Sequence, residues 1–238
     1  MGVVMKRIAI LAVMTGLTLG LMPAGNAQAE DTPPPNAIVS EGNGAAVFIG
    51  YGGDKVVNLS WRPSKKYESS NMLYQVQRSD GAMLESKTSA SEFKDVDLLP
   101  NTVYGYTLIT YKALKKSYTV TTGASKGQTI TRTVTKRVGR NAINVMTLPS
   151  MVVGLTASAD LTSMTLTWLP PQYTANPVTY TVTMDGNVMG YNITDMRFQQ
   201  AGLVCSHSYS VVVLTQNAAG YSAVSAKLSV RTTTCPRE

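Results

Sequence analysis

Apolar and polar residues alternate with a period of two in many short stretches of this chain. The clearest are residues 57–61 and 74–78 in the first half, and 164–168 and 180–182 in the second. A period of two places alternate side chains of a strand in the core and in water. Turn residues punctuate these runs and no helical period persists, so the pattern predicts an all-β protein.

The two halves of the chain repeat one another. Trp61 and Trp168 each end an alternating stretch and are soon followed by a proline. Farther on, residues 98–104 align with residues 203–209, and both runs end in a tyrosine. The separation from tryptophan to tyrosine is nearly equal in the two halves. Self-similarity at a spacing of about 100 residues, a common domain size, predicts a duplicated domain.

These repeated residues resemble the motifs of the fibronectin type III family. The shared features are a tryptophan that ends the second strand, a Tyr-x-Val on the third, and a Leu-x-Pro-x-Thr-x-Tyr before the sixth. The second half departs from the last motif, with Cys205 in place of the proline and His207 in place of the threonine. The resemblance implies two tandem immunoglobulin-like β-sandwiches. It also implies that Trp61 and Trp168 are core anchors, and that Tyr104 and Tyr209 are corner tyrosines whose hydroxyls bond to nearby backbone. Because this sandwich hosts many roles, the resemblance indicates a fold and not a function.

The first residues have the pattern of a secretory signal peptide, which we place at residues 1–29. Lys6 and Arg7 precede an apolar run at residues 8–21, and small residues at 27–29 form an A-x-A cleavage site. A transmembrane helix needs about 20 apolar residues, so the run is too short to span a membrane. We therefore expect a secreted, extracellular protein that does not cross a membrane.

The rest of the chain divides into a lead-in and two domains. Residues 30–40 hold three consecutive prolines and predict an extended linker. The first domain is expected at residues 41–148 and the second at 149–238, with a short, proline-containing join.

The chain contains two cysteines, Cys205 and Cys235. In an exported protein this even number favours a disulfide, and two buried thiols are the alternative. In the topology of the resembled family both residues fall at the same end of the second sandwich. The bond would close a loop of about 30 residues and stabilise the fold by roughly 3 kcal/mol.

The first domain departs from the family pattern by a long insertion. Its sixth strand is expected to end near Ala113 and its last strand to occupy residues 142–147, where the family has a short turn between the two. Residues 118–122 and 129–134 are strand-like and flank a turn at 123–127. We expect the insert, about residues 114–141, to form an extended β-hairpin or two long strands that run past the sandwich.

Basic residues concentrate in this insert and its flanks. The chain has 21 Lys and Arg against 14 Asp and Glu, yet outside the signal peptide and segment 112–140 the acids outnumber the bases. That segment holds no acidic residue and eight basic ones: Lys112, Lys115, Lys116, Lys126, Arg132, Lys136, Arg137 and Arg140. A local cluster of cations can form a binding face for an anionic polymer such as teichoic acid or acidic polysaccharide. The alternative is that these cations only keep the strands soluble and protect their edges from aggregation.

The sequence offers little for catalysis. His207, at a corner position, is the one histidine, so a Ser-His-Asp triad or a histidine-rich metal site is hard to build. Asp95 and Asp97 are expected in a solvated turn. Neither a glycine-rich phosphate loop nor a Cys-x-x-Cys occurs. We expect no enzyme, cofactor, metal or small-molecule substrate, and nucleic acid ranks lowest among partners because no motif for it is present.

Three functions remain open at this stage. The first is a non-catalytic extracellular binding or adhesion module, whose basic hairpin contacts an anionic cell-envelope polymer, a polysaccharide or a protein partner. The second is a structural spacer or a self-assembling surface or extracellular-matrix subunit, which would self-associate through its sheet edges. The third is an accessory module acting with a secreted carbohydrate-active enzyme.

Overall fold

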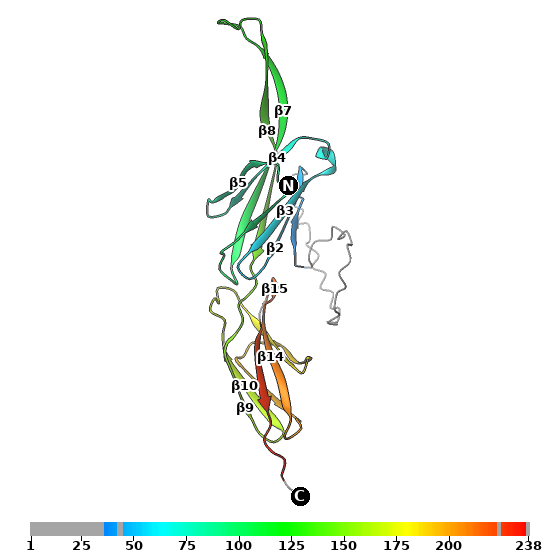
Figure 1. The fold of residues 1–238 in the computed structure, drawn as a ribbon, viewed down its shortest axis with the longest axis vertical. Coiled ribbons are helices and arrows are strands. Elements are labelled where there is room, and N and C mark those ends of the chain that lie inside the picture. The colour runs from blue at the N-terminus through cyan, green and yellow to red at the C-terminus, as the bar shows by residue number, and fades with distance from the viewer. Residues whose placement is uncertain (1–35, 42–44, 223–224, 237–238) are drawn as a thin grey trace, which may run out of the picture. The chain divides into compact units, whose positions relative to one another are not determined.

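The computed structural model describes residues 36–41, 45–222 and 225–236, and these residues belong to one compact unit. The signal peptide expected at residues 1–29 lies outside the described residues. Across the described ranges the regular elements are antiparallel strands and one short 3₁₀ helix, η1 (Lys65–Tyr67). The all-β prediction is confirmed, and Figure 1 shows the strands grouped into two sandwiches.

The first sandwich is built from two four-stranded sheets. One sheet has the order β1-β2-β3-β6 and the other β5-β4-β7-β8. The first comprises β1 (Ile38–Ser40), β2 (Ala46–Gly52), β3 (Val57–Pro63) and β6 (Glu92–Asp95). The second comprises β4 (Met72–Arg78), β5 (Met83–Thr88), β7 (Val103–Thr119) and β8 (Thr129–Met146).

The core of this sandwich follows the period-two pattern of its strands. Val57, Leu59 and Trp61 of β3 are buried while the residues between them are partly exposed. The Trp61 ring lies 5.9 Å from that of Tyr74 on the opposite sheet, and its Nε1 donates to the Ala90 carbonyl at 2.8 Å. A buried indole therefore joins the two layers with its one polar group satisfied.

The second sandwich repeats this arrangement. One sheet has the order β13-β10-β9, and the other β12-β11-β14-β15 with β16 also paired to β14. Trp168 is buried, and its ring lies 5.4 Å from that of Tyr180 in an edge-to-face contact. The strands are β9 (Val153–Ala159), β10 (Ser163–Leu169), β11 (Thr179–Met184), β12 (Asn187–Ile193), β13 (Arg197–Ala201), β14 (Ser208–Asn217), β15 (Gly220–Tyr221) and β16 (Ala226–Arg231).

The two corner tyrosines make equivalent bonds. The Tyr104 hydroxyl accepts from the Leu99 N–H at 2.8 Å, and the Tyr209 hydroxyl accepts from the Val204 N–H at 2.8 Å. Each fixes the turn that enters the long strand behind it, β7 in the first sandwich and β14 in the second.

The disulfide between Cys205 and Cys235 is present. Cys205 precedes β14 and Cys235 follows β16, the strand that pairs with β14. The bond therefore ties the last strand of the chain to the turn at which its neighbour begins.

Residues 38–40, expected in the extended lead-in, form β1 instead. Ile38 to Ser40 pair with Gly50 to Phe48 of β2. The Asn141 side chain also donates to the Ser40 carbonyl at 2.9 Å. The edge of β2 offers unpaired backbone N–H and C=O groups, and residues 38–40 form hydrogen bonds with them. The composition of this segment predicts a linker because it does not report the free edge beside it.

Asp95 differs from the solvated turn expected for it. It is 6% exposed at the end of β6, and Arg78 of the opposite sheet donates to both its carboxylate oxygens, at 2.9 and 3.1 Å. The Tyr106 hydroxyl donates to the same carboxylate at 2.9 Å. Asp95 is thus a buried structural ion between the sheets, because its charge is matched by partners distant in sequence.

Asparagines form a buried network where residues of both sandwiches meet. Asn101 is fully buried, and its side chain donates to the Asn176 and Tyr173 carbonyls at 2.7 and 3.2 Å. Asn176 donates back to the Asn101 carbonyl, and Asn217 donates to the Asn101 side chain at 3.0 Å and to the Thr147 carbonyl at 2.9 Å.

Candidate functional site

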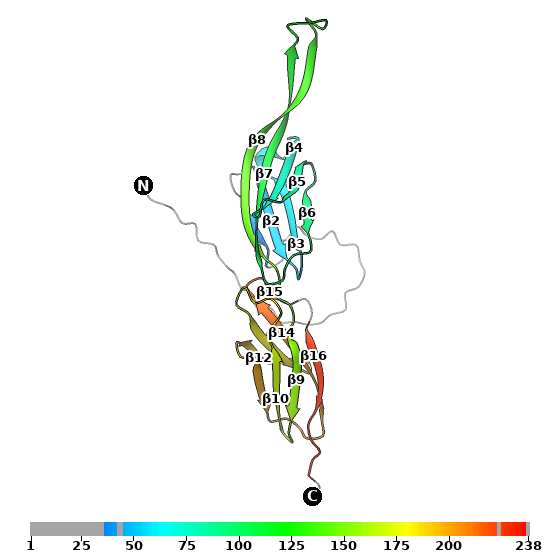
Figure 2. The ribbon, with the colours of Figure 1, turned by 90° about the vertical axis from the view of Figure 1, so that its left-hand side faces the viewer.

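The long hairpin of β7 and β8 carries the basic cluster. The pairing of β7 with β4 ends at Lys112, opposite Met72, whereas the pairing of β7 with β8 continues to Thr119 and Thr129. Beyond Lys112 the two strands therefore form a ribbon to which no third strand of the described residues pairs. Figure 2 shows β7 and β8 running on past the rest of the sandwich. The insert expected at about 114–141 is thus a continuation of the last two strands of the sandwich.

A register shift sets which side chains share a face of this ribbon. Thr110 pairs with Gly139, but Tyr111 pairs with Arg137, so Val138 is an extra residue on β8. Such a bulge bends a strand and increases its twist. Because of it, the even-numbered residues of β8 from 130 to 136 lie opposite the even-numbered residues of β7.

One face of the ribbon alternates cationic and apolar cross-strand pairs, and we call it the cation–apolar face. Opposed residues of antiparallel strands point to the same side. From the sandwich outward its pairs are Lys112 with Lys136, Leu114 with Val134, Lys116 with Arg132, and Tyr118 with Ile130. On β7 this face continues the core-facing series of Tyr106, Leu108 and Thr110, all of which are buried.

The opposite face is rich in hydroxyl groups, and we call it the hydroxyl face. Its pairs include Lys115 with Thr133, Ser117 with Thr131, and Thr119 with Thr129. The Ser117 and Thr131 hydroxyls lie 2.9 Å apart. Only polar and small side chains occupy this side of the ribbon beyond Lys112.

The structure divides the eight predicted binding residues among three places. The cation–apolar face holds Lys112, Lys116, Arg132 and Lys136. Lys115, Arg137 and Arg140 lie on the other side, where Arg140 reaches Thr107 Oγ1 at 3.5 Å. Lys126 is exposed in the turn that joins the strands. Seven of the eight residues therefore lie on two chemically different surfaces, and a count of basic residues in the sequence does not distinguish these surfaces.

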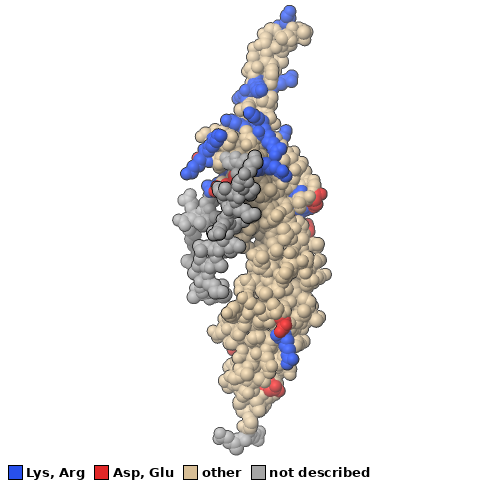
Figure 3. Space-filling view, turned by 180° about the vertical axis from the view of Figure 1, so that it is seen from behind, with Lys and Arg blue, Asp and Glu red and all other residues tan. Residues whose placement is uncertain are grey.

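A run of eight basic residues without an acidic one distinguishes the hairpin segment 112–140 from the rest of the sequence. In the described part of the chain both salt bridges belong to Arg78, and none involves the hairpin. Like charges oppose each other directly at Lys112–Lys136 and Lys116–Arg132, which destabilises a two-stranded ribbon. A bound anion would offset this repulsion. Figure 3 shows the Lys and Arg side chains along the hairpin and around its root.

Apolar side chains form a hollow on the cation–apolar face. Tyr118, Val120, Ile130, Arg132 and Val134 line a depression of about 360 Å³. Tyr118 is 48% exposed and Ile130 is 38% exposed, and neither packs against a hydrophobic core. The face therefore offers a ligand apolar surface as well as positive charge.

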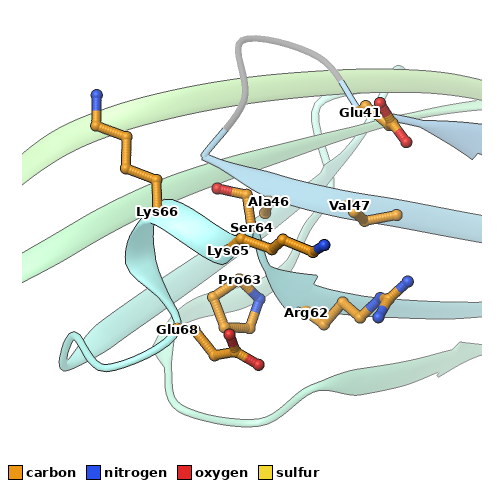
Figure 4. Close-up of a pocket in the computed structure, with 9 residues that line it drawn as sticks. All are labelled: Glu41, Ala46, Val47, Arg62, Pro63, Ser64, Lys65, Lys66 and Glu68. Atoms are coloured by element: carbon orange, nitrogen blue, oxygen red, sulfur yellow. The ribbon is translucent and has the colours of Figure 1, made fainter.

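A second groove lies near the root of the hairpin, and sequence reasoning missed it. It measures about 610 Å³, and Figure 4 shows Arg62, Lys65 and Lys66 around it together with Glu41 and Glu68. The loop that carries the two lysines is bonded to the hairpin root, since the Ala113 N–H donates to the Asn71 carbonyl at 2.8 Å. The adjacent lysines Lys65 and Lys66 were the feature of the sequence that could have indicated this groove. Because two carboxylates line the groove, its charge is mixed, and it is a weaker candidate than the hairpin for an anion-binding site.

The other side chains considered for chemistry have structural surroundings. The rings of His207 and Tyr209 meet edge to face at 4.6 Å, beside the disulfide turn. Asp95 is occupied by Arg78 and Tyr106. Within the described ranges no three His, Cys, Asp or Glu residues gather as a metal site. The same ranges contain no helix of the length and apolarity that a membrane crossing requires.

Protein-family models and curated proteins give no match to this chain. Solved structures with similar folds include a two-domain fibronectin type III segment of chicken tenascin. It is 17% identical with a TM-score of 0.36, over 82% of this chain and 97% of that one. The described residues of this chain form two tandem antiparallel β-sandwiches. The first domain carries the extended hairpin.

Two further matches have similarly low scores. A central fibronectin-III array of RIM-binding protein is 17% identical with a TM-score of 0.30, over 78% of this chain and 66% of that one. An exopolygalacturonase of Yersinia enterocolitica is 22% identical with a TM-score of 0.32, over 37% of this chain and 21% of that one. At this level of similarity nothing about function follows from any of them.

Proposed function

We propose that this protein is a non-catalytic extracellular binding module that holds an anionic cell-envelope polymer or polysaccharide through its basic hairpin. The observation that carries the proposal is the hairpin itself. Eight basic residues lie between 112 and 140 without an acidic neighbour in that segment, on strands that continue past the sheet. None of the eight forms a salt bridge with another described residue.

The physical basis is long-range attraction that salt can screen. A cluster of one sign raises the local concentration of an oppositely charged polymer. The screening length falls from about 8 Å at physiological ionic strength to about 3 Å at 1 M salt. Binding that depends on the hairpin should therefore weaken steeply as salt is added.

The test is a salt-titrated pull-down of the full chain with anionic envelope polymers. Replacing Lys115, Lys116, Arg132, Lys136 and Arg137 with glutamine should abolish binding at physiological salt. A matched variant removes five exposed cations from elsewhere and has the same net charge, so it should retain binding: Lys55, Lys94, Arg197, Lys227 and Arg231. Equal loss in the two variants would reduce the effect to net charge and overturn the proposal. Concentration-dependent oligomers without polymer binding would favour the structural-subunit function instead.

A further inference from the structure

We infer that the hairpin binds its ligand through the cation–apolar face alone, and that this ligand is an acidic polysaccharide built from sugar rings. The inference rests on the proposed function and makes it more specific. It separates ring-containing acidic polymers from polyol-phosphate or polyphosphate chains, which carry charge but no ring, and from lipid surfaces.

The spacing of the cation–apolar face supports a long, repeating ligand. Residues two apart on a strand lie about 7 Å apart on the same side. The cationic pair at Lys116 and Arg132 is therefore separated by one apolar pair from the cationic pair at Lys112 and Lys136, about 14 Å away along the ribbon. An elongated polymer that alternates negative and apolar groups matches such a surface, whereas a compact anion would engage one pair.

The apolar pairs select for sugar rings. A pyranose ring presents C–H groups on one side, and such a side packs against aromatic and aliphatic surface while its carboxylate faces outward. Tyr118, Ile130 and Val134 provide this surface in one hollow, with Arg132 at its edge as a two-pronged donor for a carboxylate. A polyphosphate chain would use the cations and leave the apolar pairs in water.

Two other occupants fit the face less well. The turn at residues 121–128 is exposed and contains Thr, Gly, Ala, Ser, Lys and Gln, so the hairpin has no large apolar side chain at its tip to enter a bilayer. A second copy of the hairpin would place cations against cations, because segment 112–140 has no acidic residue.

The test measures binding of the full chain to alginate, inorganic polyphosphate, neutral dextran, and vesicles of phosphatidylglycerol and phosphatidylcholine. Alginate supplies rings with carboxylates and polyphosphate supplies charge alone. Wild type should bind alginate more tightly than the other three probes. If it binds none of the anionic probes, the proposed function itself fails.

Two double variants with equal charge change test the face. Lys116→Gln with Arg132→Gln should weaken alginate binding about tenfold or more. Lys115→Gln with Arg137→Gln removes two cations from the other side of the same ribbon and should change it by less than about twofold. If both variants lose affinity equally while wild type binds, the restriction to one face is wrong and the proposed function survives.

A third variant tests the ring requirement. Tyr118→Ser with Ile130→Thr should weaken alginate binding about tenfold and leave polyphosphate binding unchanged. Tyr118→Phe, which keeps the ring, should bind alginate like wild type. Unchanged polyphosphate binding by the double variant would show that its hairpin still forms. Unchanged alginate binding in Tyr118→Ser with Ile130→Thr would overturn the ring requirement, and tighter binding of wild type to vesicles would assign the face to lipid.

Discussion

Asp95 holds together side chains from three strands and both sheets of the first domain. Arg78 of β4 and Tyr106 of β7 both donate to it, and Arg78 also reaches Asp80 at 2.8 Å. The Asp95 side chain is 7% exposed and that of Asp80 is 55% exposed. One arginine therefore makes a buried and an exposed ion pair, which allows a matched comparison.

Asp95→Ala should destabilise the first domain by about 3 kcal/mol, because it leaves Arg78 and the Tyr106 hydroxyl without their buried partner. Asp80→Ala breaks the exposed pair and should cost less than about 1 kcal/mol. Urea unfolding of both variants measures the difference. Equal losses would show that the ion between the sheets is no more important than the exposed one.

Tyr106 should make the protein sensitive to alkaline pH. Burial, followed by the hydrogen bond to Asp95 and the charge of that carboxylate, raises the pKa of Tyr106. An unfolded tyrosine has a pKa of about 10. The neutral phenol is therefore favoured by folding, so its stabilisation is complete below about pH 10 and is lost as the pH rises from there toward the folded-state pKa.

Tyr106→Phe should flatten this alkaline decline. The free energy of unfolding, measured in urea from pH 8 to pH 11.5, should fall less steeply above about pH 10 than in wild type. A remaining slope is expected, since burial also raises the pKa of Tyr74 and Tyr180. Parallel curves for the two proteins would contradict the assignment.

The sequence could identify Trp61 and Trp168 because each lies in a strand with a local alternation. It could not identify Asp95 as buried, because its partners Arg78 and Tyr106 lie on other strands and nothing near it in sequence neutralises its charge. Local periodicity reports which side of a strand faces the core. A buried ion pair depends on which residues of two sheets face each other, and that is set by the tertiary fold.

At the scale of elements, the hairpin also has features that the sequence predicts and one that only the structure shows. The strand-like runs and the glycine-rich turn were visible in the sequence, and so was the cluster of cations. The bulge at Val138 was not visible, yet it decides which cations share a face with Tyr118 and Ile130. An assignment of faces from the alternation of β8 alone would carry the wrong parity across the bulge.

The disulfide between Cys205 and Cys235 is the second feature at the scale of elements. Cys205→Ser with Cys235→Ser should lower the free energy of unfolding by about 3 kcal/mol, because the bond closes a loop with a sequence separation of 30. Adding a reductant should lower the melting temperature of wild type toward that of the variant and leave the variant unchanged. If the reductant destabilises both proteins equally, the bond is not the cause.

At the scale of the whole molecule, the asparagine network links residues of both domains. Asn101 has a φ of 51°, a left-handed conformation that asparagine tolerates better than alanine. Its side chain also makes three of the network's hydrogen bonds. The backbone and the side chain of this residue therefore contribute separately, and substitution can distinguish them.

Asn101→Gly keeps the backbone conformation and removes the side-chain bonds, so it should cost about 2 kcal/mol. Asn101→Ala also strains the backbone and should cost about 1 kcal/mol more. Urea unfolding of the tandem measures both. Stability like that of wild type in both variants would show that the network contributes nothing to the native state.

The covalent bond at the end of the second domain has a mechanical consequence. Tension applied beyond Cys235 would otherwise reach β16 at Arg231 and peel it from Ser208 onward, one hydrogen-bonded pair after another. The bond carries the load directly to Cys205, so the strands between the two cysteines bear no force while it is intact. A molecule pulled from this end would extend about 100 Å less than its reduced form, the contour length of the shielded loop.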